Sequence, residues 1–299
     1  MNSTSHSLHQ KIVETTEQAL KLGALKPLST QLQIMPHEGI NFCVRVLDSL
    51  VRKDVARQSQ KPKSSTQAFN PFLPYEKALC VAPLSSTHIC LLNKFNVVDH
   101  HILMVTREYE SQETWLTYAD FEVLVHCLIE IDGLGFYNSG QKAGASQHHK
   151  HLQLIPFSTE QGSQELPFAK VINAQKEILQ NSSALLAIPF CHGVQPLKIC
   201  WIEDCHREIS DSLFKIYQQL MVDIGLNLDA PQPDTPYNLL ITREWMMAVP
   251  RSQESYQGIG VNSLGYSGML LVKNLEDLER LRQIGPMNLL QAVGKPLRF

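Results

Sequence analysis

Long hydrophobic runs are missing from this sequence. No stretch approaches the roughly 18 to 20 consecutive apolar residues that a membrane-spanning helix needs. The first residues, Met1 to Gln10, are polar and lack the apolar segment of a secretory signal peptide. We therefore expect a cytoplasmic protein that has no membrane partner.

A strong excess of one charge is also missing. The formal net charge is -3, from 26 Lys and Arg against 29 Asp and Glu. Nucleic acids and anionic membranes bind basic surfaces, so this balance predicts neither partner. An anionic ligand must instead meet a locally basic pocket. Segment 52–70 carries five cations and one acid, and we interpret it as a solvated loop in which Lys53 is the best candidate for a ligand contact.

Paired cysteine motifs are absent as well. The seven cysteines are scattered, and none forms a Cys-x-x-Cys pair. This excludes the usual zinc-ribbon and thioredoxin-type patterns, and we expect reduced thiols. No internal repeat is visible, and no low-complexity tract is long enough to be a linker.

What the sequence does contain is typical of a folded protein. Apolar residues make up 43% of its 299 residues and charged residues 18%, which excludes the composition of a disordered chain. Helical and strand periodicities alternate irregularly, which predicts an α+β fold. We place a boundary at residue 185, between regions 1–185 and 186–299. The expected helices cover 7–24, 112–131, 163–179, 208–226 and turns within 275–293, and the expected strands cover 40–50, 78–82, 87–92, 101–106, 148–157, 187–202, 237–242 and 245–249.

The densest chemical signal is the stretch 138–153, which reads NSGQKAGASQHHKHLQ. Its second half continues into the strand predicted at 148–157. Alternate side chains of a strand share a face, so His149, His151 and Gln153 project together, while His148 and Lys150 point to the other side. Two imidazoles and one amide are therefore predicted to line one surface.

This arrangement suits attack on phosphorus. Imidazole is largely unprotonated near neutral pH and later leaves as a neutral group, while its second nitrogen can be held by a backbone carbonyl or by His149. Gln153 can donate amide hydrogens to a phosphate oxygen, and the loop with Gly140, Gly144 and Ser146 allows close approach of phosphate. A His-x-His metal site and a purely structural role are the alternatives, but a metal needs more ligands than the motif supplies. We favour a nucleophile.

On these residues the chain resembles the diadenosine tetraphosphate phosphorylases, also called ATP adenylyltransferases, a branch of the histidine triad superfamily related to galactose-1-phosphate uridylyltransferase. The resemblance extends over nearly the whole chain. It includes the segments 70–76, 92–106, 236–242, 250–251 and 260–269, together with Trp245 and Lys273. One departure is His148, which stands where such proteins commonly have Pro or Asp, and strand parity turns it away from the site.

The resemblance implies a histidine-triad type of α+β fold, with an antiparallel sheet flanked by helices and a C-terminal adenylyltransferase part packed on it. It also implies that His151 is the nucleophile and that Gln153 helps to hold the phosphates. From the residues themselves we assign His149 and Gln153 as further catalytic residues, and we expect no protein-bound metal, because the sequence shows no set of ligands for one. The substrate contacts that it implies are Lys53, Asn138, Gly144, Ala145, Ser146, Gln147, Asn262, Ser263, Leu264, Met269 and Lys273. We add Lys94 as a substrate contact, because cations in an acidic protein must serve its anionic ligand.

The reaction implied is reversible conversion of diadenosine tetraphosphate and inorganic phosphate into ATP and ADP by double displacement. Mg²⁺ is expected to accompany the polyphosphate. A hydrolase that passes the same intermediate to water is the alternative within enzymes. A nucleotide-binding sensor is the alternative from another class, although such a protein has no need of a nucleophile.

A few remaining polar residues receive weaker assignments. We expect Lys94 and Arg251 to contact phosphate or to support the site. His100 and His101 precede a strand and could reach a nucleotide, but we favour a structural or edge role for them. His148 is interpreted as a surface residue, and Lys150 as a charge on the solvent side of its strand.

Overall fold

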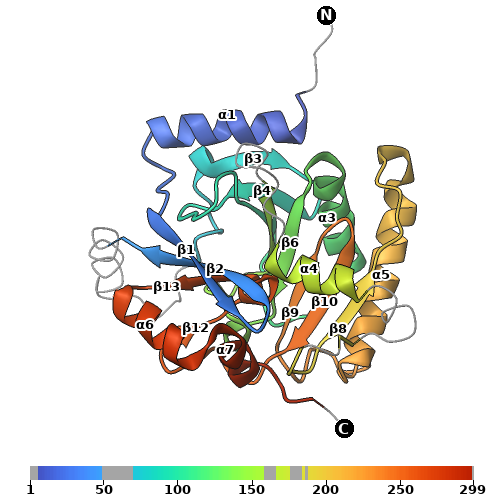
Figure 1. Cartoon of the computed structure of the whole chain (residues 1–299). Helices are drawn as coiled ribbons and strands as arrows, with labels where there is room; N and C mark the ends of the chain where they lie inside the picture. The colour runs from blue at the N-terminus through green and yellow to red at the C-terminus, as the bar shows by residue number, and fades with distance from the viewer. Residues whose placement is uncertain (1–5, 49–69, 158–165, 176–183, 186–187, 298–299) are drawn as a thin grey trace, which may run out of the picture.

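The computed structural model describes residues 6–48, 70–157, 166–175, 184–185 and 188–297. Helices and strands follow one another in mixed order (Figure 1), which confirms the predicted α+β class. Within these ranges no helix is both long and apolar enough to cross a membrane. Lys53 and positions 52–69 of the basic segment lie outside the described residues.

Eight of the described strands form one antiparallel sheet, which confirms the sheet implied by the resemblance. Because β6 pairs with β9, this large sheet joins strands from both sides of residue 185. The division into 1–185 and 186–299 stays a prediction. In spatial order the strands are β3 (Cys80–Pro83), β4 (His88–Leu92), β5 (Ile102–Thr106), β7 (His151–Pro156), β6 (Gly133–Asn138), β9 (Tyr237–Ile241), β10 (Trp245–Pro250) and β8 (Gly193–Pro196).

The two faces of the large sheet pack on different layers, because side chains alternate along each strand. One face, with Met104 and Leu152, is covered by α1 (Leu8–Lys21), α3 (Tyr118–Glu130) and α5 (His206–Asp223). The other face, with Phe136 and Ile155, is covered by α4 (Pro167–Ala174), α6 (Leu275–Ile284), α7 (Pro286–Val293) and a small sheet. Figure 1 shows α3 and α5 on one side of the molecule and β1, β2 and α6 on the other.

The small sheet combines segments from the two ends of the chain. Its central strand is β2 (Ile40–Leu47), which pairs antiparallel with β1 (Thr30–His37) and parallel with β13 (Met269–Val272). Neither β1 nor β13 is predicted by the sequence. The strand β1 exposes the apolar residues Leu32 and Ile34, and β13 is only four residues long, so neither shows a clear alternating pattern. A short hairpin of β11 (Ser255–Tyr256) and β12 (Ile259–Gly260) follows Arg251.

Several predicted boundaries shift for local reasons. The helix expected at 112–131 begins only at Tyr118, because Thr117 and Asp120 form a capping box. The strand expected at 148–157 begins at His151, and the one expected at 187–202 is reduced to β8. The helix expected at 163–179 is described as α4, and its outer parts lie outside the described residues. The remaining predicted elements correspond to α1, β2, β3, β4, β5, α5, β9, β10, α6 and α7.

Candidate active site

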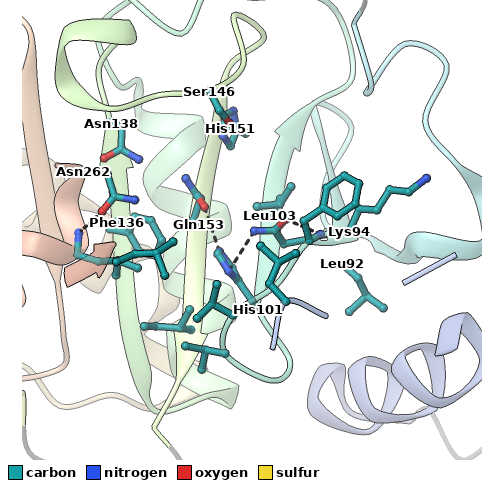
Figure 2. A pocket seen from close by; sticks show the side chains of 18 of the residues that line it. Leu92, Lys94, His101, Leu103, Phe136, Asn138, Ser146, His151, Gln153 and Asn262 are labelled. Atoms are coloured by element: carbon teal, nitrogen blue, oxygen red, sulfur yellow. Dashed lines mark hydrogen bonds between the residues drawn. The ribbon is translucent and has the colours of Figure 1, made fainter. Parts of the chain in front are cut away.

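A cavity of about 1080 Å³ lies between the large and small sheets. Strands β4 to β7 supply one wall, through residues such as Leu103 and His151, and the small sheet supplies the other, through Arg45 and Met269. Figure 2 shows His151 and Gln153 between an apolar group that includes Phe136 and another that includes Leu103. The cavity therefore has a polar centre with apolar surfaces on both sides.

His151 is the first residue of β7, and its ring is held in one tautomer. Nδ1 lies 2.8 Å from the carbonyl oxygen of His149, which can only accept, so Nδ1 carries the proton and Nε2 keeps its lone pair. The ring of Phe72 packs 5.3 Å from it, centroid to centroid. Burial lowers the pKa of His151 to about 4, so the ring is neutral at physiological pH. His151 is thus a neutral imidazole with a free nitrogen.

The side chain of Gln112 binds the backbone of His151 through both its N–H and its carbonyl group. The backbone N–H of His151 donates to Gln112 Oε1 at 2.8 Å, and Gln112 Nε2 donates to the carbonyl oxygens of Asn138 and His151 at 2.9 and 3.2 Å. The amide thus bridges the ends of β6 and β7 beyond Phe136 and Gln153, where the direct pairing of these strands ends. Gln112 therefore fixes the backbone of His151.

The loop between β6 and β7 approaches the C-terminal part of the chain closely at Gly144. Its φ is +89°, and a Cβ there would lie 2.6 Å from the carbonyl oxygen of Val261 and 2.8 Å from Asn262 Cα. Only glycine fits this position without displacing backbone. The contact brings Gly144 and Asn262 together at the edge of the cavity that both of them line.

A buried polar hub holds this edge of the cavity. Asn238 Nδ2 donates to Asn138 Oδ1 at 2.8 Å and to the Ala143 carbonyl at 2.8 Å. Ser263 donates to the same Asn138 oxygen through its backbone N–H at 2.8 Å and its hydroxyl at 2.7 Å. Arg251 in turn donates to Asn238 Oδ1 at 2.7 Å. Because the oxygen of Asn138 is occupied, its amide nitrogen is left to face the cavity (Figure 2).

Comparison of the chain with known proteins shows which family it belongs to. A family model described as the Ap4A phosphorylase N-terminal domain matches residues 1–174, and one described as the ATP adenylyltransferase C-terminal domain matches residues 186–296. The chain belongs to the Ap4A phosphorylase family. The family that the sequence motifs indicated is therefore confirmed.

Relatives from yeast match this family member over most of their length. Diadenosine 5',5'''-P1,P4-tetraphosphate phosphorylase 2 of Saccharomyces cerevisiae (strain ATCC 204508 / S288c) is 31% identical, over 93% of this chain and 90% of its own. Protein APA1 of the same strain is 28% identical, over 83% and 80%. The crystal structure of yeast Ap4A phosphorylase Apa2 superposes with a TM-score of 0.78 at 28% identity, over 99% of both chains, and its complex with Ap4A with 0.76 at 27%, over 98% of both.

Most of the predicted site residues of this Ap4A phosphorylase family member meet in this cavity. Those that line it are Lys94, Asn138, Gly144, Ser146, Gln147, His151, Gln153, Asn262, Leu264 and Met269. Four others do not line it: His149, Ala145, Ser263 and Lys273. Ser263 is buried and bonds Asn138, and Lys273 is exposed. Their roles, and that of Lys53, which lies outside the described residues, stay predictions.

The two histidines of the motif differ in their surroundings. His149 Nε2 lies 2.8 Å from the Thr106 carbonyl, and Nδ1 lies 3.0 Å from Asn70 Nδ2, so the ring is engaged on both sides. The acceptor for His151 is therefore the backbone carbonyl of His149 and not its ring. Of the two open alternatives for holding His151, the structure selects the carbonyl.

The interpretation of Lys150 as a solvent-side charge is wrong. Strand parity does turn Lys150 away from His151, but that face of the sheet is covered by α3 instead of water. Its side chain is 1% exposed, and Nζ lies 2.8 Å from Asp120 Oδ2 and 3.1 Å from Glu110 Oε2. His88 Nε2 lies 3.0 Å from the other oxygen of Asp120. Burial alone would raise the pKa of Asp120, but the bond to His88 and the charge of Lys150 hold it below its usual value.

Three residues of the site were missed or given too small a role. Gln112 and Asn238 belong to no recognisable local motif. Gln112 bonds the backbone of His151 and Asn238 bonds the carbonyl of Ala143, and both contacts join segments that are far apart in the sequence. The signal that could have found Asn238 is its position inside the family-like segment 236–242. His101, assigned a structural or edge role, lines the cavity and bonds Gln153.

Charged side chains at the cavity are mainly basic. Lys26, Arg45 and Lys94 line it, with Glu76 as the single carboxylate among the described lining residues. Lys94 Nζ is paired with Glu76 Oε2 at 2.6 Å. Arg251 was expected either to contact phosphate or to support the site. Its guanidinium is buried in the polar hub, where it bonds Asn238 and the Val261 carbonyl, so it supports the site. The cavity thus offers an anion a locally basic surface in an acidic protein.

Proposed function

We propose that this protein converts diadenosine tetraphosphate and inorganic phosphate into ATP and ADP, reversibly, through a nucleotidyl group carried on His151. The observation that carries the proposal is the free Nε2 of a neutral, tautomer-locked His151 at the centre of the cavity. Apolar surfaces on both sides of it suit two nucleosides, and the family membership and the named relatives support the same reaction.

In the proposed reaction His151 Nε2 attacks the α-phosphorus of one adenosine. A P–N bond forms, the bond to the bridging oxygen breaks, and ATP leaves. The ring becomes positively charged, and its Nδ1–H bond to the His149 carbonyl stabilises that charge. An oxygen of inorganic phosphate then attacks the same phosphorus, ADP forms, and His151 returns to its neutral state.

The first test is incubation of the purified protein with diadenosine tetraphosphate, with and without inorganic phosphate, followed by chromatography of the products. ATP and ADP that form only with phosphate are the expected result. ATP and AMP without phosphate would instead identify a hydrolase. No products with intact binding would identify a sensor and overturn the proposal.

We further propose that Mg²⁺ enters with the polyphosphate, bound through phosphate oxygens. Glu76 is the one carboxylate among the described lining residues. Because it is paired with Lys94, it is a poor ligand for Mg²⁺. In the described ranges no group of three His, Cys, Asp or Glu side chains could hold a metal. The charge that Mg²⁺ neutralises when bound lies on the substrate, while Lys26 and Arg45 provide the protein's own cations.

Gln153→Ala is expected to lower turnover more than nucleotide affinity. The amide donates to a phosphoryl oxygen whose charge grows in the transition state, so its loss costs on the order of a hundredfold in kcat. Steady-state kinetics with diadenosine tetraphosphate, together with calorimetric titration of AMP, separate the two effects. Weaker binding with unchanged turnover would contradict the role assigned to Gln153.

The acid limb of the pH profile is expected near pH 4 and not near 6.5. Burial lowers the pKa of His151 to about 4, so Nε2 is protonated and unreactive only as the pH falls through that value. The diagnostic quantity is kcat/KM for diadenosine tetraphosphate, because it reports the free enzyme. A midpoint near 6.5, with the protein still folded by circular dichroism, would show that the nucleophile is a solvated histidine.

A further inference from the structure

Three hydrogen bonds run in a row from the backbone of segment 93–95 to Gln153. The backbone N–H of Phe95 lies 3.3 Å from Asn93 Oδ1, and Asn93 Nδ2 lies 3.1 Å from His101 Nδ1. His101 Nε2 lies 3.0 Å from Gln153 Oε1. Figure 2 shows His101 joined to Gln153 beside His151.

The backbone fixes the direction of every bond in this row. A backbone N–H only donates, so it must meet the oxygen of Asn93, and the Asn93 nitrogen then faces His101. That nitrogen donates to Nδ1, which must be unprotonated, so the proton of His101 is on Nε2. An N–H at Nε2 must meet the oxygen of Gln153. The amide nitrogen of Gln153 is therefore the end left toward the cavity, away from His101 (Figure 2).

The surroundings keep this direction from reversing. His101 is 8% exposed, and its ring packs on Phe136 with centroids 5.8 Å apart. Gln153 is paired with Leu103 on β5 and with Phe136 on β6, so its backbone is fixed on both sides. Burial lowers the pKa of His101 to about 4, so the ring stays neutral and Nδ1 stays an acceptor at working pH.

We propose that His101 is a positioning residue for nucleotidyl transfer: it holds the Gln153 amide with its N–H groups toward the phosphoryl group that His151 attacks. This rests on the proposed function. A Gln153 amide turned over would present its oxygen to phosphoryl oxygens, which repel it. Without the His101 bond both orientations are open, and the donor is in place for only part of the time.

The first experiment compares three replacements of His101. His101→Phe keeps a ring against Phe136 but has no N–H, and we expect turnover to fall on the order of tenfold or more with KM little changed. In His101→Gln the amide nitrogen is the same number of bonds from Cα as Nε2 of the histidine. It can therefore donate to Gln153 Oε1 in the same way, and we expect most of the turnover to return. His101→Asn is too short to reach Gln153 and behaves like His101→Phe. If the glutamine variant is as slow as the phenylalanine variant, the proposal fails.

A double-mutant cycle separates this role from a structural one. If His101 acts only through Gln153, His101→Phe causes no further loss of turnover in a Gln153→Ala background. Losses that multiply would show that His101 acts by another route and would overturn the proposal. Thermal unfolding of each variant confirms that the compared proteins are folded.

A spectroscopic measurement tests the same arrangement without the reaction. In protein with ¹⁵N-labelled histidine, the His101 signals are identified by their loss in His101→Phe. We expect Nε2 protonated and Nδ1 unprotonated between pH 6 and 8. The opposite tautomer, or a charged ring, would overturn the proposal whatever the enzyme does. If the wild-type protein fails to form ATP and ADP, the proposed function is overturned. The assigned tautomer of His101 does not depend on that result.

Discussion

Alanine at position 151 will lower phosphorolysis of diadenosine tetraphosphate by on the order of 10⁴-fold or more, while the protein remains folded. In the proposed reaction Nε2 of His151 is the atom that bonds phosphorus, and the other motif histidine cannot replace it. Both nitrogens of His149 are engaged, with Thr106 and Asn70. The measurement is ATP and ADP formation under saturating phosphate.

The nucleotidyl group proposed to be carried on His151 can be tested for directly by mass spectrometry. Wild-type protein mixed with diadenosine tetraphosphate without phosphate should gain the mass of one adenylyl group, and His151→Ala should not. The matched control is His148→Ala, an exposed histidine of the same motif, which should keep wild-type turnover. Wild-type rates in His151→Ala would remove the central assignment. A mass gain in that variant would place the carrier on another residue.

The second large effect concerns stability. Lys150→Met should lower the free energy of unfolding by about 3–5 kcal/mol, because it leaves the carboxylate of Asp120 buried without its cation. Both side chains of the pair are 1% exposed, so water cannot replace the lost partner. Urea unfolding at neutral pH measures the change. The loss should then shrink in Lys150→Met combined with Asp120→Asn, which removes the stranded charge.

The contribution of the Lys150–Asp120 pair to the free energy of unfolding should depend on pH. Because the folded state holds the pKa of Asp120 below its usual 3.8, the ionised pair contributes stability above that value and loses it as the pH falls further. In Lys150→Met the buried Asp120 loses the charge that holds its pKa down, so its pKa rises and protonation removes the stranded charge as the pH falls. The difference between wild type and Lys150→Met should therefore be larger at pH 7 than near pH 4. An unfolding free energy unaffected by Lys150→Met at pH 7 would show that the pair contributes nothing net.

Local patterns account for what the sequence predicted well. The helix at α5 and the strands β4 and β5 have the apolar spacing of their element, and the motif of 138–153 identified His151 and Gln153 without tertiary information. Strand parity also placed Lys150 on the correct face. It could not show that the face is buried, because α3 covers it from another part of the chain.

Contacts between distant segments account for what was missed. The strand β13 pairs with β2 across more than two hundred residues of sequence, and neither strand's pattern specifies the other. Asn238 matters because it meets Asn138 and Ala143 in space. His101 was read as structural because nothing near it in sequence shows that Gln153 is its partner.

The parallel pairing of β2 with β13 also bears on how the enzyme is made. His151 and Gln153 leave the ribosome long before Met269 and Leu270, which supply part of the opposite wall of the cavity. During that interval the nascent chain holds His151 without an enclosed place for a substrate. We infer that activity arises late in translation, when the last strand of the small sheet docks, and that partly synthesised chains do not consume dinucleotides.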